Sequence, residues 1–414
     1  MTDLLHRQAT SALPTSTPPT PSWAIGTPRL LAGLDSAGVL DARTHLAVHG
    51  PLPATDLGHL LGLLDAAHIA GRGGAGFDLA HKIRALRGAR EVIVNGCESE
   101  PGSHKDRTLL TRSPHLVLDG ALVLASAIGA RTVTVAVHDP GAAQALRVAV
   151  AARPDSRHVR VLMVPGGFVS GEARALIRAL AGGPARPPGR QTHSTDKGIL
   201  LSNAESVAQV AILLRLGSHR YGSSGTAAEP GTTLLTVGGA VTRPSVVEIP
   251  LGTPLEIVLY AAGSAPPQAV VIGGYHGSWH APPPGLLLSR AGLAAAGGSF
   301  GAGVLLVLDQ NTCALGELAR VARWLAAQST KQCGPCRFGL PALAQDVVAL
   351  YRGAPAEEAA HRHSRAVLGR GACHHPDGAV RFVTSGLRLL RDEMQAHRHG
   401  GCGRPILGQL PVTS

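Results

Sequence analysis

Hydrophobic and polar positions follow two alternating patterns from about residue 50 to about residue 215. Short runs rich in β-branched residues, "EVIVNG", "RTVTVAV" and "VRVLMV", have the length and composition of buried strands. Longer amphipathic stretches stand between and after them, "LVLDGALVLASAIG", "GAAQALRVAVAAR" and "GEARALIRALA", and these are typical of helices. Strands that alternate with helices predict an α/β domain with a largely parallel sheet.

Two other patterns follow this region. Between about residues 230 and 275, brief strands are punctuated by Gly and Pro and followed by one helix, which predicts a small, separate α+β module. From about residue 310, apolar residues recur every three or four positions in "LGELARVARWLAAQ", "FGLPALAQDVVALYRG" and "GAVRFVTSGLRLLRDEMQAH". That spacing predicts a C-terminal helical bundle.

These patterns divide the 414-residue chain into five segments. In order they are a partly flexible N-terminal extension (1–45), an α/β domain (46–228), an α+β module (229–305), a helical bundle (306–398) and a tail (399–414). The Pro/Ser/Thr tract "LPTSTPPTPS" lies in the extension, so we expect the folded part to begin near Trp23.

Composition narrows the functional classes. The formal charge of +11 is carried by scattered arginines, and only 3% of the residues are aromatic, so a nucleic-acid-binding role is disfavoured. The first residues lack the basic and apolar blocks of a signal peptide, and no apolar run approaches the roughly 20 residues that span a bilayer. Because six cysteines are few for a disulfide-stapled secreted protein, we expect a cytoplasmic protein.

A glycine-rich string, "GRGGAGF" at residues 71–77, precedes the predicted helix "DLAHKIRALRGA". Such loops let backbone N–H groups approach a phosphate at a helix start, and Lys82 in the early turns could complete an anion site. The preceding "LLGLLDAAHIA" has the pattern of a helix, whereas the dinucleotide fingerprint requires a strand there. Phosphate binding in another architecture and a turn that serves only packing both remain open.

An acidic loop, "VNGCESEPGSHKDR", follows the predicted strand "EVIV". It places Asn95, Glu98 and Glu100 at the carboxyl end of that strand, where open α/β sheets bind ligands. Two carboxylates and an amide there could hold the hydroxyl groups of a ribose or ribityl chain. The alternative is a solvated turn.

The two loops together resemble the FMN-binding domain of the NADH-binding flavoprotein (51 kDa-type) subunit of respiratory complex I and of related soluble hydrogenases and formate dehydrogenases. The resemblance continues in order through "SGEARALI", "LLSNAESV", "LLTVGGAVTRPSVVEIPLGT", "CGPCRFGLPAL" and "CHHPDGAV", and covers roughly residues 60–395. It implies an FMN domain, a ubiquitin-like SLBB module and a bundle that carries a 4Fe–4S cluster.

The resemblance also assigns residues. It implies a flavin pocket made by Gly71, Arg72, Gly73, Gly74, Gly76, Lys82, Asn95, Glu98, Gly171, Glu172, Ser202 and Asn203. It places Phe77 and Glu100 on the nicotinamide side, with Glu100 as the catalytic residue.

For the cluster, the resemblance aligns Cys333 and Cys336, at the exit of a predicted helix, with the second and third cysteines of a C-x-x-C-x-x-C motif, and Cys373 with a distant fourth. Thr330 stands where the first cysteine is expected. Three outcomes stay open. They are a cluster whose remaining corner comes from His374, His375 or Cys402, a zinc site of the three cysteines and one of these histidines, and no metal at all.

The flavin side also departs from the family pattern. Cys97 replaces an aspartate, Ala173 replaces the second glutamate of a "GEE" motif, and "GGPARPPGRQTHST" replaces an aromatic "KPPFP" segment. These changes weaken the case for NADH more than the case for FMN. Outside the motifs, we expect Cys313 to be a buried small hydrophobe and His397 to be solvated.

The sequence therefore predicts an FMN-dependent, NADH dehydrogenase-like oxidoreductase. It would pass electrons from a reduced nicotinamide cofactor through FMN and an iron–sulfur cluster to a ferredoxin-like or thioredoxin-fold iron–sulfur partner. The alternatives are a flavin reductase or diaphorase with a structural zinc, and a non-catalytic assembly subunit that retains the fold.

Overall fold

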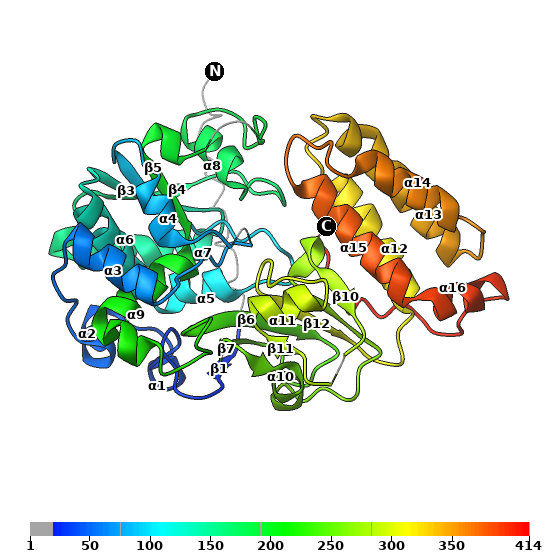
Figure 1. Cartoon of the computed structure of the whole chain (residues 1–414), viewed down its shortest axis with the longest axis horizontal. Coiled ribbons are helices and arrows are strands. Elements are labelled where there is room, and N and C mark those ends of the chain that lie inside the picture. The colour runs from blue at the N-terminus through cyan, green and yellow to red at the C-terminus, as the bar shows by residue number, and fades with distance from the viewer. Residues whose placement is uncertain (1–19, 75, 191–192, 283, 414) are drawn as a thin grey trace, which may run out of the picture.

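The computed structural model describes residues 20–74, 76–190, 193–282 and 284–413 (Figure 1). Most of the Pro/Ser/Thr tract, and with it the predicted flexibility of the N-terminal extension, lies outside these ranges. No helix within them combines the length and the apolar character needed to cross a bilayer.

The first layer is a parallel sheet of four strands among the described residues, in the order β4-β3-β2-β5. Its strands are β2 (Glu91–Asn95), β3 (Thr132–Val137), β4 (Val159–Met163) and β5 (Ile199–Asn203). The predicted parallel α/β domain is confirmed, and "EVIVNG", "RTVTVAV" and "VRVLMV" are indeed strands.

Helices connect and cover these strands. They are α1 (Leu34–Ala37), α2 (Ala42–His49), α3 (Leu57–Ala66), α4 (Leu79–Arg84), α5 (Lys105–Arg112), α6 (Pro114–Ile128), α7 (Pro140–Ala151), α8 (Ala173–Leu180) and α9 (Ala204–Tyr221). The "LLGLLDAAHIA" segment forms α3, as its pattern predicts. Aspartates begin several helices by accepting a backbone N–H: Asp78 caps α4 at 2.7 Å and Asp139 caps α7 at 2.7 Å.

A second, mixed sheet follows, in the order β1-β7-β6-β12-β9-β10 among the described residues. Its strands are β1 (Ser22–Ala24), β6 (Thr232–Gly239), β7 (Ser245–Pro250), β9 (Ala269–Ile272), β10 (Ser278–His280) and β12 (Val304–Leu308). A small pair of β8 (Thr253–Pro254) and β11 (Leu287–Leu288), with α10 (Leu255–Ala261) and α11 (Arg290–Ala295), lies beside it. The N-terminal segment joins this sheet, because β1 pairs in parallel with β7.

The C-terminal region is helical, as predicted. It contains α12 (Ala314–Ala327), α13 (Leu340–Tyr351), α14 (Glu357–Val367), α15 (His375–Leu389) and α16 (Arg391–Arg398). A wide helical turn at Pro335–Gly339 leads into α13. Cys336 therefore sits at the entry of α13, and the expectation that the cysteine pair marks the exit of the preceding helix is corrected.

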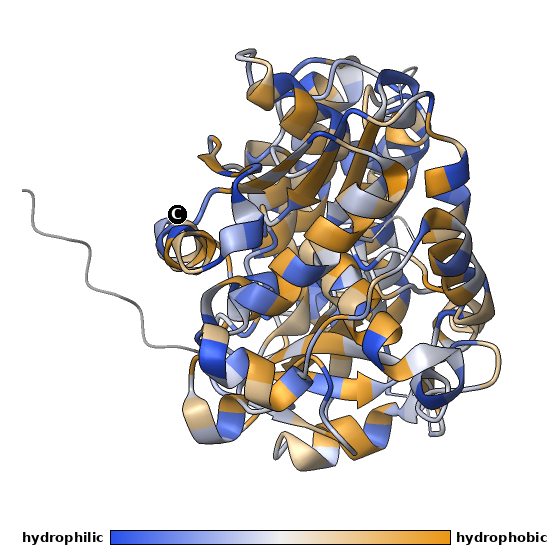
Figure 2. Cartoon of the chain, turned by 90° about the vertical axis from the view of Figure 1, so that its left-hand side faces the viewer, coloured by the Kyte–Doolittle hydropathy of each residue, from blue (hydrophilic) through white to orange (hydrophobic). Residues whose placement is uncertain are grey.

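Neighbouring residues on the strands of the second sheet point to opposite faces, so this sheet packs against the helical bundle on one face and forms a separate core on the other. Val271 and Leu306 pack into the core of the helical bundle, while their neighbours Val270 and Leu305 pack into a separate core on the other face. This is the period of two expected for a strand with both faces covered. Figure 2 shows the strands in the upper part of the view, those of the first sheet, as largely hydrophobic.

Candidate functional site

The site begins at the point where the strand order of the first sheet reverses. β2 lies between β3, which follows it in the chain, and β5, which comes much later, so the crevice between β2 and β5 is a topological switch point. Asn95 and Asn203 end these two strands and are paired in register. The structure thus brings together two amides that are more than a hundred residues apart, at the edge where such sheets bind ligands.

The glycine-rich loop lies over this crevice. Its base is closed by the N–H of Gly71, which donates to the carbonyl of Phe77 at 2.8 Å. Gly74 and Gly76 have φ angles of 90° and 65°, which a residue with a side chain adopts only under strain. A methyl group at Gly73 would stand 3.2 Å from Cβ of Asn203. The loop therefore needs its glycines both for its shape and for its approach to β5.

A cavity of about 320 Å³ is lined in part by Gly71, Gly74 and Gly76 of the same loop. Cationic side chains of Arg72, Lys105 and Arg290 line it, with Glu205 as the carboxylate. Burial, and then the positive charge of Arg72, lowers the pKa of Arg290. Within the described residues, Nε of the buried Arg72 has no hydrogen-bond partner. Another nitrogen of Arg72 donates to the carbonyl of Thr232 at 3.2 Å, so the donor left for a ligand is its Nε–H. A free buried donor among other cations fits an anion such as a phosphate.

A buried ionic network supports the floor of the cavity. Nζ of Lys105 lies 2.8 Å from Asp106 and 3.0 Å from Glu205. Burial opposes the charge of Lys105, but these carboxylates, and then Glu98, outweigh it and raise its pKa. Asn203 donates to Asp106 at 2.5 Å, which ties the network to the end of β5. Sequence reasoning missed Lys105 and Glu205 because they become neighbours only through the fold.

The acidic loop uses its two carboxylates differently. Glu98 accepts the backbone N–H groups of Asp106 at 3.1 Å and Arg107 at 2.9 Å, so it holds the start of α5. Glu100 is 8% exposed and accepts the N–H of Tyr275 at 3.0 Å. Burial raises the pKa of Glu100 to about 8, although the hydrogen bond from Tyr275 works in the opposite direction.

The other predicted flavin residues surround the crevice. Asn95 donates to the carbonyl of Gly171 at 2.9 Å. Nζ of Lys82 donates to the carbonyl of Leu201 in β5, and burial lowers the pKa of this amine. Glu172 begins α8 by accepting two backbone N–H groups and pairs with Arg174 at 2.7 Å.

Two of the predicted residues, Ser202 and Phe77, differ strongly in how much of the side chain is exposed to solvent. Ser202, one residue before the end of β5, is buried at 6% exposure, whereas Phe77 is 66% exposed at the end of the glycine loop. Contacts at the ends of β2 and β5 join part of the predicted set: Asn95 donates to Gly171, Lys82 donates to Leu201, and Gly73 approaches Asn203.

The motif cysteines, Cys333, Cys336 and Cys373, meet beyond the C-terminal end of α12. Cys336 and Cys373 are 2% and 4% exposed, and Cys333 is half-buried. Burial, followed by the neighbouring thiols of Cys333 and Cys373, raises the pKa of Cys336 to about 12. Three soft sulfur ligands in one place fit three corners of an iron–sulfur cluster.

The structure reduces the number of residues that could supply the fourth ligand of the cluster. Nε2 of His375 donates to the carbonyl of Leu325 at 3.0 Å, and Nδ1 contacts Nε2 of His276 at 3.0 Å, so both ring nitrogens are engaged. The hydroxyl of Thr330 accepts from Gln332 at 3.2 Å. His374, beside Cys373, has a side chain that is 73% exposed. The suggestion that His375 supplies the corner is not supported, and His374 remains available.

Cys402, the third residue suggested for that corner, lies elsewhere. Its sulfur and ligand atoms of Cys313, Glu393 and His397 are all within 4.8 Å of one another, and we call these four residues the tail group. Cys313 is buried as expected but surrounded by polar atoms, and His397 is half-buried and hydrogen-bonded, so the expectation of a solvated side chain is corrected. No local spacing in the sequence signals this group.

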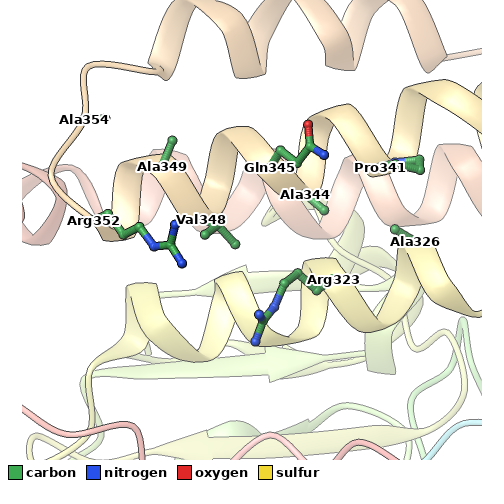
Figure 3. Close-up of a pocket in the computed structure, with 9 residues that line it drawn as sticks. All are labelled: Arg323, Ala326, Pro341, Ala344, Gln345, Val348, Ala349, Arg352 and Ala354. Carbon is green, nitrogen blue, oxygen red and sulfur yellow. The ribbon is translucent and has the colours of Figure 1, made fainter.

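Another cavity, of about 480 Å³, is lined by no cysteine of either group. It is a groove between α12 and α13 near Arg323, Val348 and Arg352 (Figure 3). Its lining contains two arginines and a glutamine, but no carboxylate, thiol or imidazole. The smaller cavity at the glycine loop is the better candidate for a functional site, because it combines three cationic side chains with a carboxylate.

Comparison with known families matches two separate segments. Residues 64–212 match the Nuo51 FMN-binding domain, and residues 316–397 match the NADH-ubiquinone oxidoreductase-F iron-sulfur binding region. The first segment contains the crevice between β2 and β5. The second contains the motif cysteines.

Whole-chain relatives agree with these matches. The F subunit of NADH-quinone oxidoreductase from Mycobacterium tuberculosis is 29% identical over 381 residues, with 83% of this chain and 85% of the relative covered. That of Aquifex aeolicus is 26% identical over 373 residues, with 83% and 87% covered.

Solved structures extend the comparison to the fold. A chain of NAD⁺-reducing [NiFe]-hydrogenase in the H₂-reduced state has 27% identity and a TM-score of 0.77, with 90% of this chain and 66% of that chain covered. In the air-oxidized state the TM-score is 0.80 at 26% identity, with 91% of this chain and 68% of that chain covered. Two matched segments that together make up more than half of the chain, relatives that align over most of its length, and a shared fold therefore agree: this chain belongs to the family of 51 kDa, FMN-binding F subunits of complex I, which also occurs in NAD⁺-reducing [NiFe]-hydrogenase.

Proposed function

We propose that this chain is the NADH-oxidising flavoprotein component of an electron-transfer complex, and that it takes electrons from NADH through FMN to a 4Fe–4S cluster. One observation carries the proposal. Gly73 of the glycine loop approaches Asn203 at the switch point, and Gly71, Gly74 and Gly76 of the same loop line the cavity that contains Arg72 and Lys105. All of these residues lie within the FMN-binding match. A flavin mononucleotide has one part suited to the switch point, a polyhydroxyl chain with its ring, and one part suited to the cavity, a phosphate.

In this proposal, the chain's own groups have separate tasks. Backbone N–H groups of Gly73, Gly74 and Gly76 bind the phosphate together with the Nε–H of Arg72, which has no hydrogen-bond partner among the described residues. Lys82 adds positive charge near the end of β5. Asn95 and Asn203 orient the hydroxyl groups at the crevice. When bound, FMN supplies the acceptance of an electron pair and its release as single electrons, which side chains do not provide.

Glu100 and Phe77 are proposed for the nicotinamide side. A pKa of about 8 keeps the buried Glu100 carboxyl protonated at neutral pH, so it does not repel the phosphates of a dinucleotide. Phe77 is exposed and offers a ring face on which a nicotinamide can stack.

The motif cysteines are proposed to hold three irons of the cluster, and the exposed imidazole of His374 is the candidate for the fourth. The second sheet with α10 and α11 corresponds in this proposal to the SLBB module. Electrons would leave to a ferredoxin-like or thioredoxin-fold iron–sulfur protein. Thiols that serve as metal ligands suit a reducing compartment, and we therefore place the protein in the cytoplasm.

The test is an anaerobic titration of the purified protein with NADH, followed by absorbance and electron paramagnetic resonance. We expect the flavin bands to bleach and the signal of a reduced cluster to appear. Flavin with zinc but without iron would instead indicate a flavin reductase or diaphorase, and colourless, metal-free protein would indicate a non-catalytic assembly subunit. Either result overturns the proposal.

A further inference from the structure

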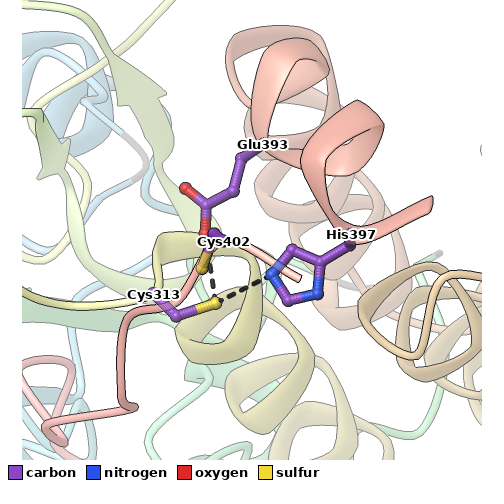
Figure 4. A group of neighbouring side chains, drawn as sticks. All are labelled: Cys313, Glu393, His397 and Cys402. Carbon is purple, nitrogen blue, oxygen red and sulfur yellow. Dashed lines mark hydrogen bonds between the residues drawn. The ribbon is translucent and has the colours of Figure 1, made fainter. Parts of the chain in front are cut away.

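We propose that the tail group forms a zinc site that fastens the C-terminal tail to the start of α12. Cys313 is the N-cap of α12, Glu393 and His397 lie one turn apart on α16, and Cys402 follows in the tail. Figure 4 shows the four side chains directed toward one another from these three segments. The site lies at the N-terminal end of α12, whereas the motif cysteines follow its C-terminal end, and the 14 residues of this helix span about 21 Å.

The spacing fits a single small ion. Sγ of Cys313 lies 3.1 Å from Oε1 of Glu393 and 3.3 Å from Nε2 of His397. Ligand atoms around tetrahedral zinc, at bond lengths of about 2.0–2.3 Å, lie roughly 3.3–3.8 Å apart. All four ligand atoms are already within 4.8 Å of one another, so only small side-chain movements are needed to bind zinc.

The tautomer of His397 is set for metal binding. Its Nδ1 lies 2.6 Å from the carbonyl oxygen of Tyr351. Because a carbonyl oxygen can only accept, Nδ1 carries the proton, and a neutral ring then presents the lone pair of Nε2 toward Cys313. A metal-binding histidine typically has this arrangement, with the second nitrogen held by a carbonyl or carboxylate.

Without a cation, the thiol of Cys313 faces two acceptors with a single proton. A carboxylate oxygen, an imidazole lone pair and two sulfurs converge, yet the two thiols can donate at most two protons. The buried thiol of Cys313 has both Glu393 and His397 as neighbours and can satisfy only one of them. One divalent ion in place of the thiol protons would satisfy all four groups.

The surroundings of the ligands stabilise them in the charged form. The N–H of Gly316 donates to Sγ of Cys313 at 3.2 Å, and the N–H of Leu315 donates to Glu393 at 3.0 Å. Both donors belong to the first turn of α12, where the helix dipole favours negative charge. Arg404 pairs with the other oxygen of Glu393 at 2.8 Å, which balances two thiolates and a carboxylate around a +2 ion.

The ligand set identifies the class of metal. Two sulfurs, one imidazole and one carboxylate favour zinc, whereas calcium and magnesium prefer oxygen ligands alone. All four positions are supplied by the chain, so we assign a closed, structural site with no open position for a substrate.

The path of the chain explains what the site fastens. Gly400 and Gly401, with φ angles of 111° and 109°, let the chain turn back after α16. Beyond Cys402 the tail lies along the bundle: Pro405 accepts the N–H of Cys313 at 2.7 Å, and Leu410 is fully buried. Zinc at the root of this segment would link the tail, α16 and α12 independently of the proposed redox function.

The test is zinc analysis of the full-length protein, purified under reducing conditions and dialysed against a weak chelator. We expect one zinc per chain, lost in Cys402→Ser and in His397→Ala. The matched controls are Cys97→Ser, a buried cysteine outside both groups, and His399→Ala, an exposed histidine two residues away. Both controls should retain the zinc.

Cobalt gives a second readout that does not depend on the variants. The cobalt-exchanged wild-type protein should show the visible absorption of a tetrahedral site with thiolate ligands, and Cys402→Ser should lose it. Zinc retained by both Cys402→Ser and His397→Ala would overturn the proposal. So would a Cys313–Cys402 disulfide in the purified protein, detected by mass spectrometry after alkylation without reduction.

Discussion

Two cysteine-containing groups occupy opposite ends of α12, and they differ in how they are encoded. The motif cysteines have two members three residues apart in the sequence and belong to a segment with a recognised family match, yet Thr330 stands at one of their four positions. The tail group has no motif, because its members are spread from residue 313 to residue 402, yet it has four ligand atoms within 4.8 Å. A metal site can therefore have a recognisable sequence motif without a full set of ligands, and it can have a full set of ligands without a motif.

This difference has a chemical meaning. A cluster of several irons has widely separated corners and can bind an outside ligand at one of them, whereas a single zinc ion needs four ligands closely gathered. Among the described residues, only the tail group has three or more candidate ligand atoms gathered within 4.8 Å. We therefore propose that the motif cysteines serve electron transfer and that the tail group attaches the C-terminal tail.

The largest expected effect is a reciprocal loss of metals. Cys336→Ser should lose most of the bound iron and keep the zinc, since it removes a buried sulfur from the motif cysteines only. Cys402→Ser should do the reverse. Iron and zinc are measured on both variants by mass spectrometry. Loss of both metals through one substitution, or unchanged iron in Cys336→Ser, would contradict the assignment of two separate metal sites.

Next in size is the effect of Lys82→Glu on flavin. Removing a half-buried positive charge and adding a negative one near a phosphate should weaken FMN binding at least about 10-fold, because a charge-assisted hydrogen bond contributes about 1.5–3 kcal/mol. The control is Lys197→Glu, on an exposed residue. Fluorescence titration of the flavin-free protein measures both, and zinc content should stay constant. Wild-type FMN affinity in Lys82→Glu would remove this lysine from the site.

A third test concerns Glu100, which joins the flavin side to the region of α12 through Tyr275. Its folded pKa of about 8 is raised above the ordinary value of 4.5, so folding binds a proton between these pH values. The stability contribution of this proton is present below about pH 4.5 and is lost as the pH rises to about 8.

Glu100→Gln should therefore gain stability relative to the wild type between pH 5 and pH 8, on the order of 3 kcal/mol. The glutamine oxygen can still accept the N–H of Tyr275. Thermal unfolding of both proteins at the two pH values measures the gain. An equal difference at pH 5 and pH 8 would show that Glu100 is already ionised in the folded protein.

The smallest expected effect is that of Phe77→Ala. Because the side chain is exposed, stability should change little, while loss of an aromatic stacking partner worth about 0.5–1.5 kcal/mol should raise KM for NADH about 3- to 10-fold. Steady-state oxidation of NADH with ferricyanide as acceptor measures it. An unchanged KM would place the nicotinamide away from Phe77.

Much of the fold is predictable from local pattern. The runs that form β2, β3 and β4 are short and apolar, and the long amphipathic stretches form α6, α7 and α12, because burial of one face determines each element separately. The pairing of β1 with β7 is not predictable in this way, because a three-residue strand has no periodicity and its position depends on partners over two hundred residues away.

The candidate site shows the same limit. Asn95 could be placed at a strand end from its neighbours, but its pairing with Asn203 follows from strand order. The role of Lys105 depends on Glu205, which is a hundred residues away in the sequence. The sequence around Cys313 predicts only a buried hydrophobe, because none of its ligand partners is close in sequence. Functional groups that converge through tertiary structure leave no spacing to detect.

The most direct test of the account is a count of FMN, iron and zinc on one anaerobically purified sample of the full chain. The account predicts about one FMN, about four irons and one zinc per chain. Protein that is fully folded by circular dichroism but contains neither flavin nor iron would contradict it.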